Sequence, residues 1–212
     1  AFLLFGLLGV VWALAFFPAF LWSLTKMIQE KKRSFVIVSG IFFACIIFSH
    51  NILAFMFSFF AISYALFLLW KEKFHKQQIM FTGLSFLIGL SLSAVFWVPA
   101  VFEIGYVKGL QIYDLTKNFP DIAQLLFPSW GSGFSGGNVA DQMSFQIGVA
   151  NLLTVLLAVI VLIKKKAKRL LISFFLLWFY LLFYLMLDIS KPVWLTIPFL
   201  NPKSILVNYF IS

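Results

Sequence analysis

Long apolar runs alternate with short polar segments along almost the whole chain. Six runs approach or exceed the length of a membrane helix: 1–25, 35–48, 52–70, 79–100, 145–163 and 170–187. A transmembrane helix needs about 20 apolar residues to cross the hydrocarbon core. A further apolar run begins at residue 205. The pattern predicts an all-α, polytopic transmembrane helix bundle with about six spans and the start of a seventh.

Two longer segments are too polar to lie in lipid. Residues 101–143 form a loop rich in Gly and Ser, and residues 188–204 form a polar segment that contains proline. We therefore predict one transmembrane domain over residues 1–212 with these two segments outside the bilayer. Because the chain begins at Ala1 without methionine and ends within an apolar run, we expect it to be an internal fragment of a longer protein.

The spacing of the runs also predicts how some helices pack. Only three residues, ending in His50 and Asn51, separate the second run from the third, so these helices should form a tight hairpin with both side chains at its tip. The fourth run is rich in Gly and Ser, which let membrane helices approach closely, and is expected at the centre of the bundle. Pro18 is expected to kink the first helix.

Composition and charge agree with a membrane location and add an orientation. The chain is 63% hydrophobic and 11% charged, with a mean hydropathy of +1.03. Of its 16 Lys and Arg residues, 12 lie in the connections after the first, third and fifth runs. The positive-inside rule makes these connections cytoplasmic, which places the 101–143 loop outside. We expect a multi-pass protein of the cell's inner (cytoplasmic) membrane. Its expected partner is the lipid bilayer, and we expect no nucleic-acid partner.

Four polar residues are candidates for a site on the outer face: His50, Asn51, Glu103 and Asp141. His50 and Asn51 either hold a ligand or cap helix ends. Glu103 follows a long apolar run, so its carboxylate could bind a cation or orient a hydroxyl, or simply pair with Lys108. Asp141 precedes a helix and is suited to capping it.

Two tryptophans extend this candidate site. Trp97 and Trp130 either stack on a sugar ring or lie at the membrane interface. The spacing of the acidic residues carries no metal signature, so no cofactor is firmly implied, and a divalent cation is left as an open alternative. The G-x-G-x-x-G pattern at 131–136 follows no predicted strand, which argues against a dinucleotide site. The single cysteine, Cys45, lies in an apolar run.

Several motifs together resemble a known family. F-S-H-N-I at the hairpin tip is followed by L-S-A-V-F-W-V-P-A-V-F-E, F-P-S-W-G-S-G and D-Q-M-S-F-Q-I-G. Over roughly residues 48–151 this order resembles the bacterial multi-pass "6-pyruvoyl-tetrahydropterin synthase-related" membrane proteins, whose layout is similar to that of GT-C glycosyltransferases. The resemblance implies transfer of sugar from a polyprenyl-phosphate carrier at the outer face. It also implies that the catalytic acidic residue lies upstream of this chain, so no catalytic residue is assigned here.

Three functions therefore stay open at this point. A GT-C-like glycosyltransferase is the first, with the outer polar residues binding donor or acceptor. A transporter or flippase of lipid-linked or polymeric saccharide is the second, although the apolar runs carry no charged residue in their interiors. A non-catalytic membrane protein of envelope assembly is the third.

Overall fold

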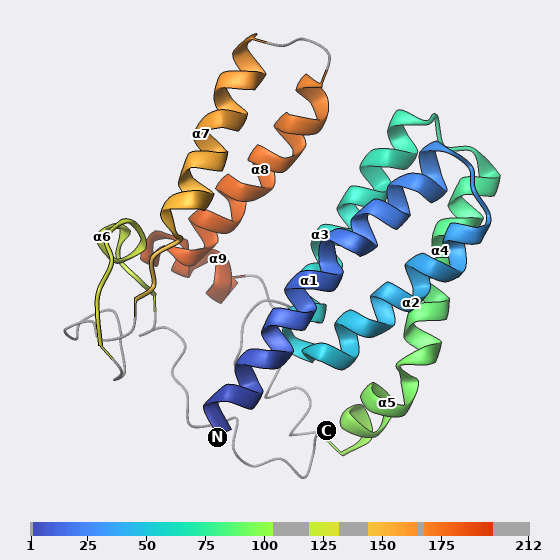
Figure 1. Cartoon of the computed structure of the whole chain (residues 1–212), viewed down its shortest axis with the longest axis horizontal. Coiled ribbons are helices and arrows are strands. Elements are labelled where there is room, and N and C mark those ends of the chain that lie inside the picture. The colour runs from blue at the N-terminus through green and yellow to red at the C-terminus, as the bar shows by residue number, and fades with distance from the viewer. Residues whose placement is uncertain (1, 104–118, 132–143, 165–167, 197–212) are drawn as a thin grey trace. The chain divides into compact units, whose positions relative to one another are not determined.

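The structure is a computed structural model that describes residues 2–103, 119–131, 144–164 and 168–196 (Figure 1). In these ranges the regular elements are helices, as the hydrophobic pattern predicts. The chain divides into two compact units, Ala1–Ile104 and Gly105–Ser212. Each unit is described by itself.

Unit 1 is a bundle of helices joined by tight turns. Its helices are α1 (Phe2–Gln29), α2 (Ser34–Ser49), α3 (Asn51–Lys71), α4 (Lys76–Leu92) and α5 (Ala94–Phe102). Helix α1 packs antiparallel to α2, with ring contacts from Phe16 to Phe42 and from Trp22 to Phe35. It also lies along α3, where the Thr25 and Tyr64 hydroxyls are 2.8 Å apart. Helices α1, α2 and α3 lie side by side in one compact group (Figure 1).

Two glycines bring α2 and α4 into close contact. A Cβ atom added to Gly40 would lie 2.6 Å from Ile88 Cγ2, and one added to Gly89 would lie 2.6 Å from Phe43 Cδ1. Side chains at these positions would clash, so the glycines allow the two helices to approach. Helix α2 contacts α1, α3 and α4, while α4 packs mainly against α2. The predicted close approach of α4 is therefore seen, but the central helix of unit 1 is α2 and not α4, because α2 packs against α1, α3 and α4.

The fourth predicted helix is interrupted at Ser93, between α4 and α5. The Ser93 hydroxyl donates to the Gly89 carbonyl at 2.8 Å, and Trp97 Nε1 donates to the Leu90 carbonyl at 2.9 Å. Both carbonyls lie in the last turn of α4, where a helix end exposes acceptors, and the Gly89 carbonyl also accepts from the Ser93 N–H at 3.1 Å. The prediction of one continuous helix over 79–100 was wrong because these side chains satisfy the carbonyls that a break exposes.

Unit 2 contains a helical hairpin and short helices. Its elements are α6 (Ile122–Leu126), α7 (Val149–Lys164), α8 (Arg169–Met186), the 3₁₀ turn η4 (Asp188–Ser190) and α9 (Lys191–Thr196). Helices α7 and α8 pack on each other. Residues 144–148 are not helical, so α7 begins later than the predicted residue 145. Instead, Gln146 and Ile147 donate hydrogen bonds to the Leu126 and Leu125 carbonyls, which tie this segment to α6.

Within the part of the chain that the structure describes, three helices are long and apolar enough to cross a membrane: Leu8–Gln29 within α1, α3 and α8. Helices α2 and α7 are apolar but have 16 residues each, about 24 Å at 1.5 Å per residue. The structure therefore supports a helical membrane protein, and the number of six spans stays a prediction. Pro18 lies inside α1, which continues through it as one helix.

Candidate functional site

The polar and basic residues of unit 1 lie at opposite ends of its bundle. The turns α1–α2 and α3–α4 form one end, called here the basic end, with Lys26, Lys31, Lys32, Arg33, Lys71, Lys73 and Lys76. The α2–α3 turn, which holds His50 and Asn51, forms the other end, called here the tip. Helix α5 lies at the tip, since the Phe48 and Phe96 rings are 6.3 Å apart. In Figure 1 α5 and the α2–α3 turn lie at the end of the bundle away from the α1–α2 and α3–α4 turns.

His50 caps helix α3. Its backbone is extended, with φ −161° and ψ 105°, and its Nδ1 accepts a hydrogen bond from the Leu53 N–H at 3.3 Å. This bond requires an unprotonated Nδ1, so the neutral ring carries its proton on Nε2. The α1 helix approaches the same turn, because a Cβ atom on Gly9 would lie 2.5 Å from the Ser49 carbonyl oxygen. The hydrogen bond from the Leu53 N–H therefore supports the interpretation of His50 as a helix cap.

The other candidates at the tip are more exposed. Asn51 Oδ1 accepts from the Ile52 N–H at 2.8 Å, and its side chain is exposed. Glu103 ends α5, where its N–H donates to the Pro99 carbonyl at 2.8 Å and its side chain is exposed. The indole N–H of Trp97, which is the only hydrogen-bond donor of this side chain, donates to the Leu90 carbonyl at the α4–α5 break. His50 and Asn51 therefore lie at the tip, and α5, which carries Trp97 and precedes Glu103, reaches the tip through Phe96.

Asp141, and also Lys108, the alternative partner of Glu103, lie outside the described residues. Trp130 belongs to unit 2 and is 91% exposed, which leaves its ring free to lie in a membrane interface or on a ligand. Among the described residues no group of three or more His, Cys, Asp and Glu side chains could hold a metal ion.

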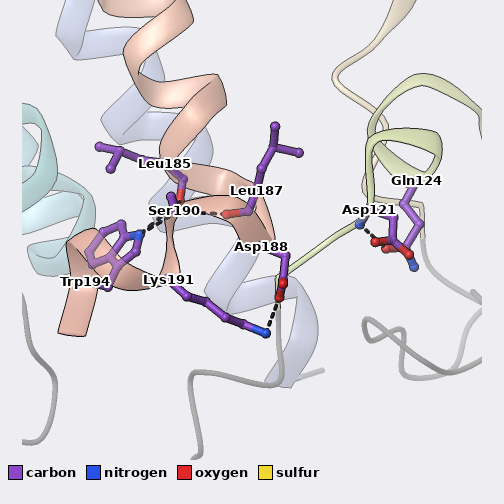
Figure 2. A network of polar contacts seen from close by, with 8 residues as sticks. All are labelled: Asp121, Gln124, Leu185, Leu187, Asp188, Ser190, Lys191 and Trp194. Carbon is purple, nitrogen blue, oxygen red and sulfur yellow. Dashed lines mark hydrogen bonds and ion pairs between the residues drawn. The ribbon is translucent and has the colours of Figure 1, made fainter. Parts of the chain in front are cut away.

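Unit 2 has a polar network at the end of α8 that the sequence did not reveal (Figure 2). Ser190 is buried, and its hydroxyl lies 2.7 Å from the Leu187 carbonyl and 2.9 Å from the Leu185 carbonyl. Trp194 Nε1 donates to the Leu185 carbonyl and to Ser190 Oγ, at 3.1 Å each. These bonds satisfy the last carbonyls of α8, so the network ends the helix.

Charged side chains lie beside this network. Lys191 forms an ion pair with Asp188 and lies over the Phe119 ring, 5.7 Å from its centre. Asp121 precedes α6, and its N–H donates to Gln124 Oε1 at 2.7 Å. Figure 2 shows both groups, with the Lys191 amine directed at the Asp188 carboxylate (Figure 2). The positive charge of Lys191 is therefore matched by a carboxylate and a ring, an arrangement suited to fixing the segment after α8.

The comparison with protein families agrees with the membrane character of these helices. A family model described as "6-pyruvoyl-tetrahydropterin synthase related domain; membrane protein" matches residues 3–203. The chain belongs to this family. No curated protein and no solved structure matches it. Family membership and the apolar helices together make this chain a membrane protein.

Sequence reasoning overlooked one set of residues in this family member. Ser39 of α2 and Gln78, Thr82 and Ser85 of α4 are polar and buried inside unit 1. Their signal was present in the spacing of 78, 82 and 85, which places the three α4 side chains on one helix face.

Proposed function

We propose that this chain is the membrane-embedded part of a GT-C-like glycosyltransferase that uses a polyprenyl-phosphate-linked sugar at the outer face. The observation that carries the proposal is the position of His50 and Asn51 at the tip, which α5 contacts through Phe96, opposite the basic end. Trp97 and Glu103 belong to this α5 segment and complete the proposed site. A polar end of this kind suits a carrier whose lipid lies in the bilayer and whose sugar lies in water. The motif order in the sequence favours this class among membrane enzymes.

The topology that fits this function has six spans and one orientation. We infer that α2, α7 and the α4–α5 pair also cross or enter the membrane, in addition to the three helices of spanning length. The basic end then faces the cytoplasm of a cell whose inner membrane holds the protein, as the charge bias favours. The tip, loop 101–143 and segment 188–204 face outwards.

Glu103 would orient the acceptor hydroxyl in this proposal. Its carboxylate is exposed at the end of α5, where an acceptor in water or at the headgroups can reach it. General base or orienting contacts of this type contribute about 10²–10⁴-fold to a rate. A basic side chain or a divalent cation would stabilise the leaving phosphate.

The test is sugar transfer by membranes that contain the Glu103→Gln variant. The proposal predicts at least a hundredfold loss of transfer from a polyprenyl-phosphate sugar, with unchanged helical content and melting temperature. Glu72→Gln is the matched control, because Glu72 also follows the last turn of a helix, as the C-cap of α3, but it is half-buried and lies at the basic end. Full transfer by the Glu103 variant would remove this residue from the mechanism.

His50 needs two substitutions to separate its capping contact from a role in transfer. His50→Asn keeps a side-chain acceptor for the Leu53 N–H, whereas His50→Ala removes it. Loss of transfer in both variants, with the melting temperature lowered only in the alanine variant, would place the imidazole at the substrate. Full transfer by His50→Asn would leave His50 with its capping contact alone.

A transporter of lipid-linked saccharide is the second candidate, and the break at Ser93 favours it. Discontinuous helices supply substrate and ion sites in many transporters. Movement of a fluorescent polyprenyl-phosphate sugar across proteoliposomes, without sugar transfer to an acceptor, would support this candidate and contradict the enzyme.

A further inference from the structure

Most hydroxyl side chains in the helices of unit 1 are satisfied by their own helix. Those of Ser23, Thr25, Ser49, Ser58, Ser63 and Ser93 each donate to a carbonyl three or four residues earlier. Such back-bonding is the usual solution for a hydroxyl that lies away from water. It leaves the helix surface free of unpaired polar atoms.

Four buried side-chain oxygens depart from this rule. They are Ser39 Oγ, Gln78 Oε1, Thr82 Oγ1 and Ser85 Oγ, and none has a hydrogen-bond partner in the part of the chain that the structure describes. The four residues are only 0%, 2%, 7% and 0% exposed, respectively. They are called here the polar row. Leaving a buried polar group unpaired costs about 1–3 kcal/mol.

The polar row lies in one continuous strip between helices. Gln78, Thr82 and Ser85 are spaced by four and three residues, so they share one face of α4. Ser39 of α2 lies at the level of Ser85, because a Cβ atom on the adjacent Gly40 would lie 3.0 Å from the Ser85 carbonyl oxygen. Gln78 Nε2 donates to the Ile28 carbonyl of α1, which brings the third helix to the strip.

The two ends of the strip differ. Gln78 lies in the first turn of α4, next to the basic end. Towards the tip, the rings of Phe20, Phe43 and Phe86 contact one another, with centres 5.1–5.8 Å apart. These rings are called here the phenylalanine cluster. Gly89, the next small residue on the α4 face, packs against Phe43. The strip is thus polar at the basic end and closed by aromatic rings towards the tip.

We propose that the polar row binds a short file of water molecules that enters from the basic end and stops at the phenylalanine cluster. Water is the ligand that suits neutral hydroxyl and amide oxygens, since buried waters typically make two to four bonds to otherwise unsatisfied groups. Gln78 and Ser85 are seven positions apart along α4, which is about 10 Å at 1.5 Å per residue. That length requires more than one molecule, and a single ion could not reach all four oxygens.

This hydrated strip is separate from the tip where the proposed transfer occurs. It brings water into the α2–α4 interface from the opposite end of unit 1. The glycines hold α2 and α4 in close contact, whereas hydrogen bonds between the polar row and water can break and form again.

Silver ions test the proposal, because Ag⁺ is small, travels with water and reacts with thiolates. In a Cys45→Ala background, Thr82→Cys and Ser85→Cys are exposed to Ag⁺ on both sides of membrane vesicles, and the thiols that stay free are counted after denaturation. Leu87→Cys on the exposed face of α4 and Ile46→Cys in the buried apolar core are the matched controls. The proposal predicts reaction at positions 82 and 85 at least tenfold faster than at 87 and 46.

A measurement on the unaltered protein covers the case in which a cysteine variant misfolds. Solid-state NMR transfer of magnetisation from water should reach the Thr82 and Ser85 amides as quickly as it reaches Lys76 at the surface, and the Ile46 amide much more slowly. Equal silver rates at all four cysteines in folded variants, or transfer to Ser85 as slow as to Ile46, would overturn the proposal.

Discussion

The glycines of unit 1 differ sharply in what surrounds them. At Gly40 an added Cβ atom would lie 2.6 Å from Ile88 Cγ2 and 3.0 Å from the Ser85 carbonyl oxygen. At Gly83 it would meet no atom of another described residue within 4 Å. One glycine is therefore required by packing, while the other only lowers the stability of its helix.

We expect Gly40→Ala to destabilise the protein by about 1–3 kcal/mol, because overpacking forces side chains or helices apart. Gly83→Ala should be neutral or stabilising, since alanine is favoured over glycine in a helix by about 0.8–1.0 kcal/mol. Thermal unfolding in detergent, followed by circular dichroism, compares the two. Equal melting temperatures for the two variants would show that α2 and α4 do not pack as described.

Glu30 gives unit 1 a small dependence on pH. It accepts hydrogen bonds from Lys26 and from Lys32, the latter at 2.7 Å, and these bonds lower the pKa of its carboxyl below the ordinary value of 4.5. Because the pKa is lowered in the folded state, the stabilisation is complete above the ordinary value and is lost as the pH falls through the lowered one. The effect is small, since the pair is exposed to solvent.

The measurement for Glu30 is the melting temperature between pH 6 and pH 3 in the wild type and in Glu30→Gln. The wild type should lose slightly more stability than the variant as the pH falls below the ordinary pKa of 4.5. Parallel curves for the two proteins would mean that the ion pairs contribute nothing in solution.

At the scale of elements, hydrophobic pattern predicts where a helix lies better than where it stops. The second, third and sixth runs match α2, α3 and α8 to within a residue at each end. The break at Ser93 was missed because apolar residues continue to Ala100, while the stop depends on hydrogen bonds from Ser93 and Trp97. Likewise, α7 starts at Val149 because Gln146 and Ile147 bond to α6, a contact distant in sequence.

The break between α4 and α5 should depend on the Trp97 indole. Trp97→Phe keeps the ring but removes the donor to the Leu90 carbonyl, so we expect a loss of about 0.5–1.5 kcal/mol, the usual net value of one hydrogen bond. Trp130→Phe is the matched control, because Trp130 is 91% exposed and its loss should not change the melting temperature. A similar decrease in both variants would point to a general effect of tryptophan and not to the break.

At the scale of the whole molecule, the sequence predicted the candidate tip residues but not their partners. His50 and Asn51 were placed at the hairpin tip from spacing alone, and the structure agrees. The approach of Gly9 to the α2–α3 turn could not be predicted, because it depends on a contact between helices far apart in the chain. The shared face of Gln78, Thr82 and Ser85 could be seen in their spacing, but their burial depends on the packing of α4 against other helices. Hydrophobicity alone also hides the polar row, since Ser and Thr are common in membrane helices.

The orientation of the whole chain gives the last prediction. If basic connections face the cytoplasm, a cysteine at Ser132 lies outside and a cysteine at Lys166 lies inside, although both positions fall beyond the described residues. In a Cys45→Ala background, an impermeant maleimide added to intact spheroplasts should label Ser132→Cys and should reach Lys166→Cys only after permeabilisation. Labelling of position 166 but not 132 in intact cells would reverse the topology and place the tip in the cytoplasm. A tip on that side could not meet an outward-facing lipid-linked sugar, so this result would also end the proposal of transfer at the outer face.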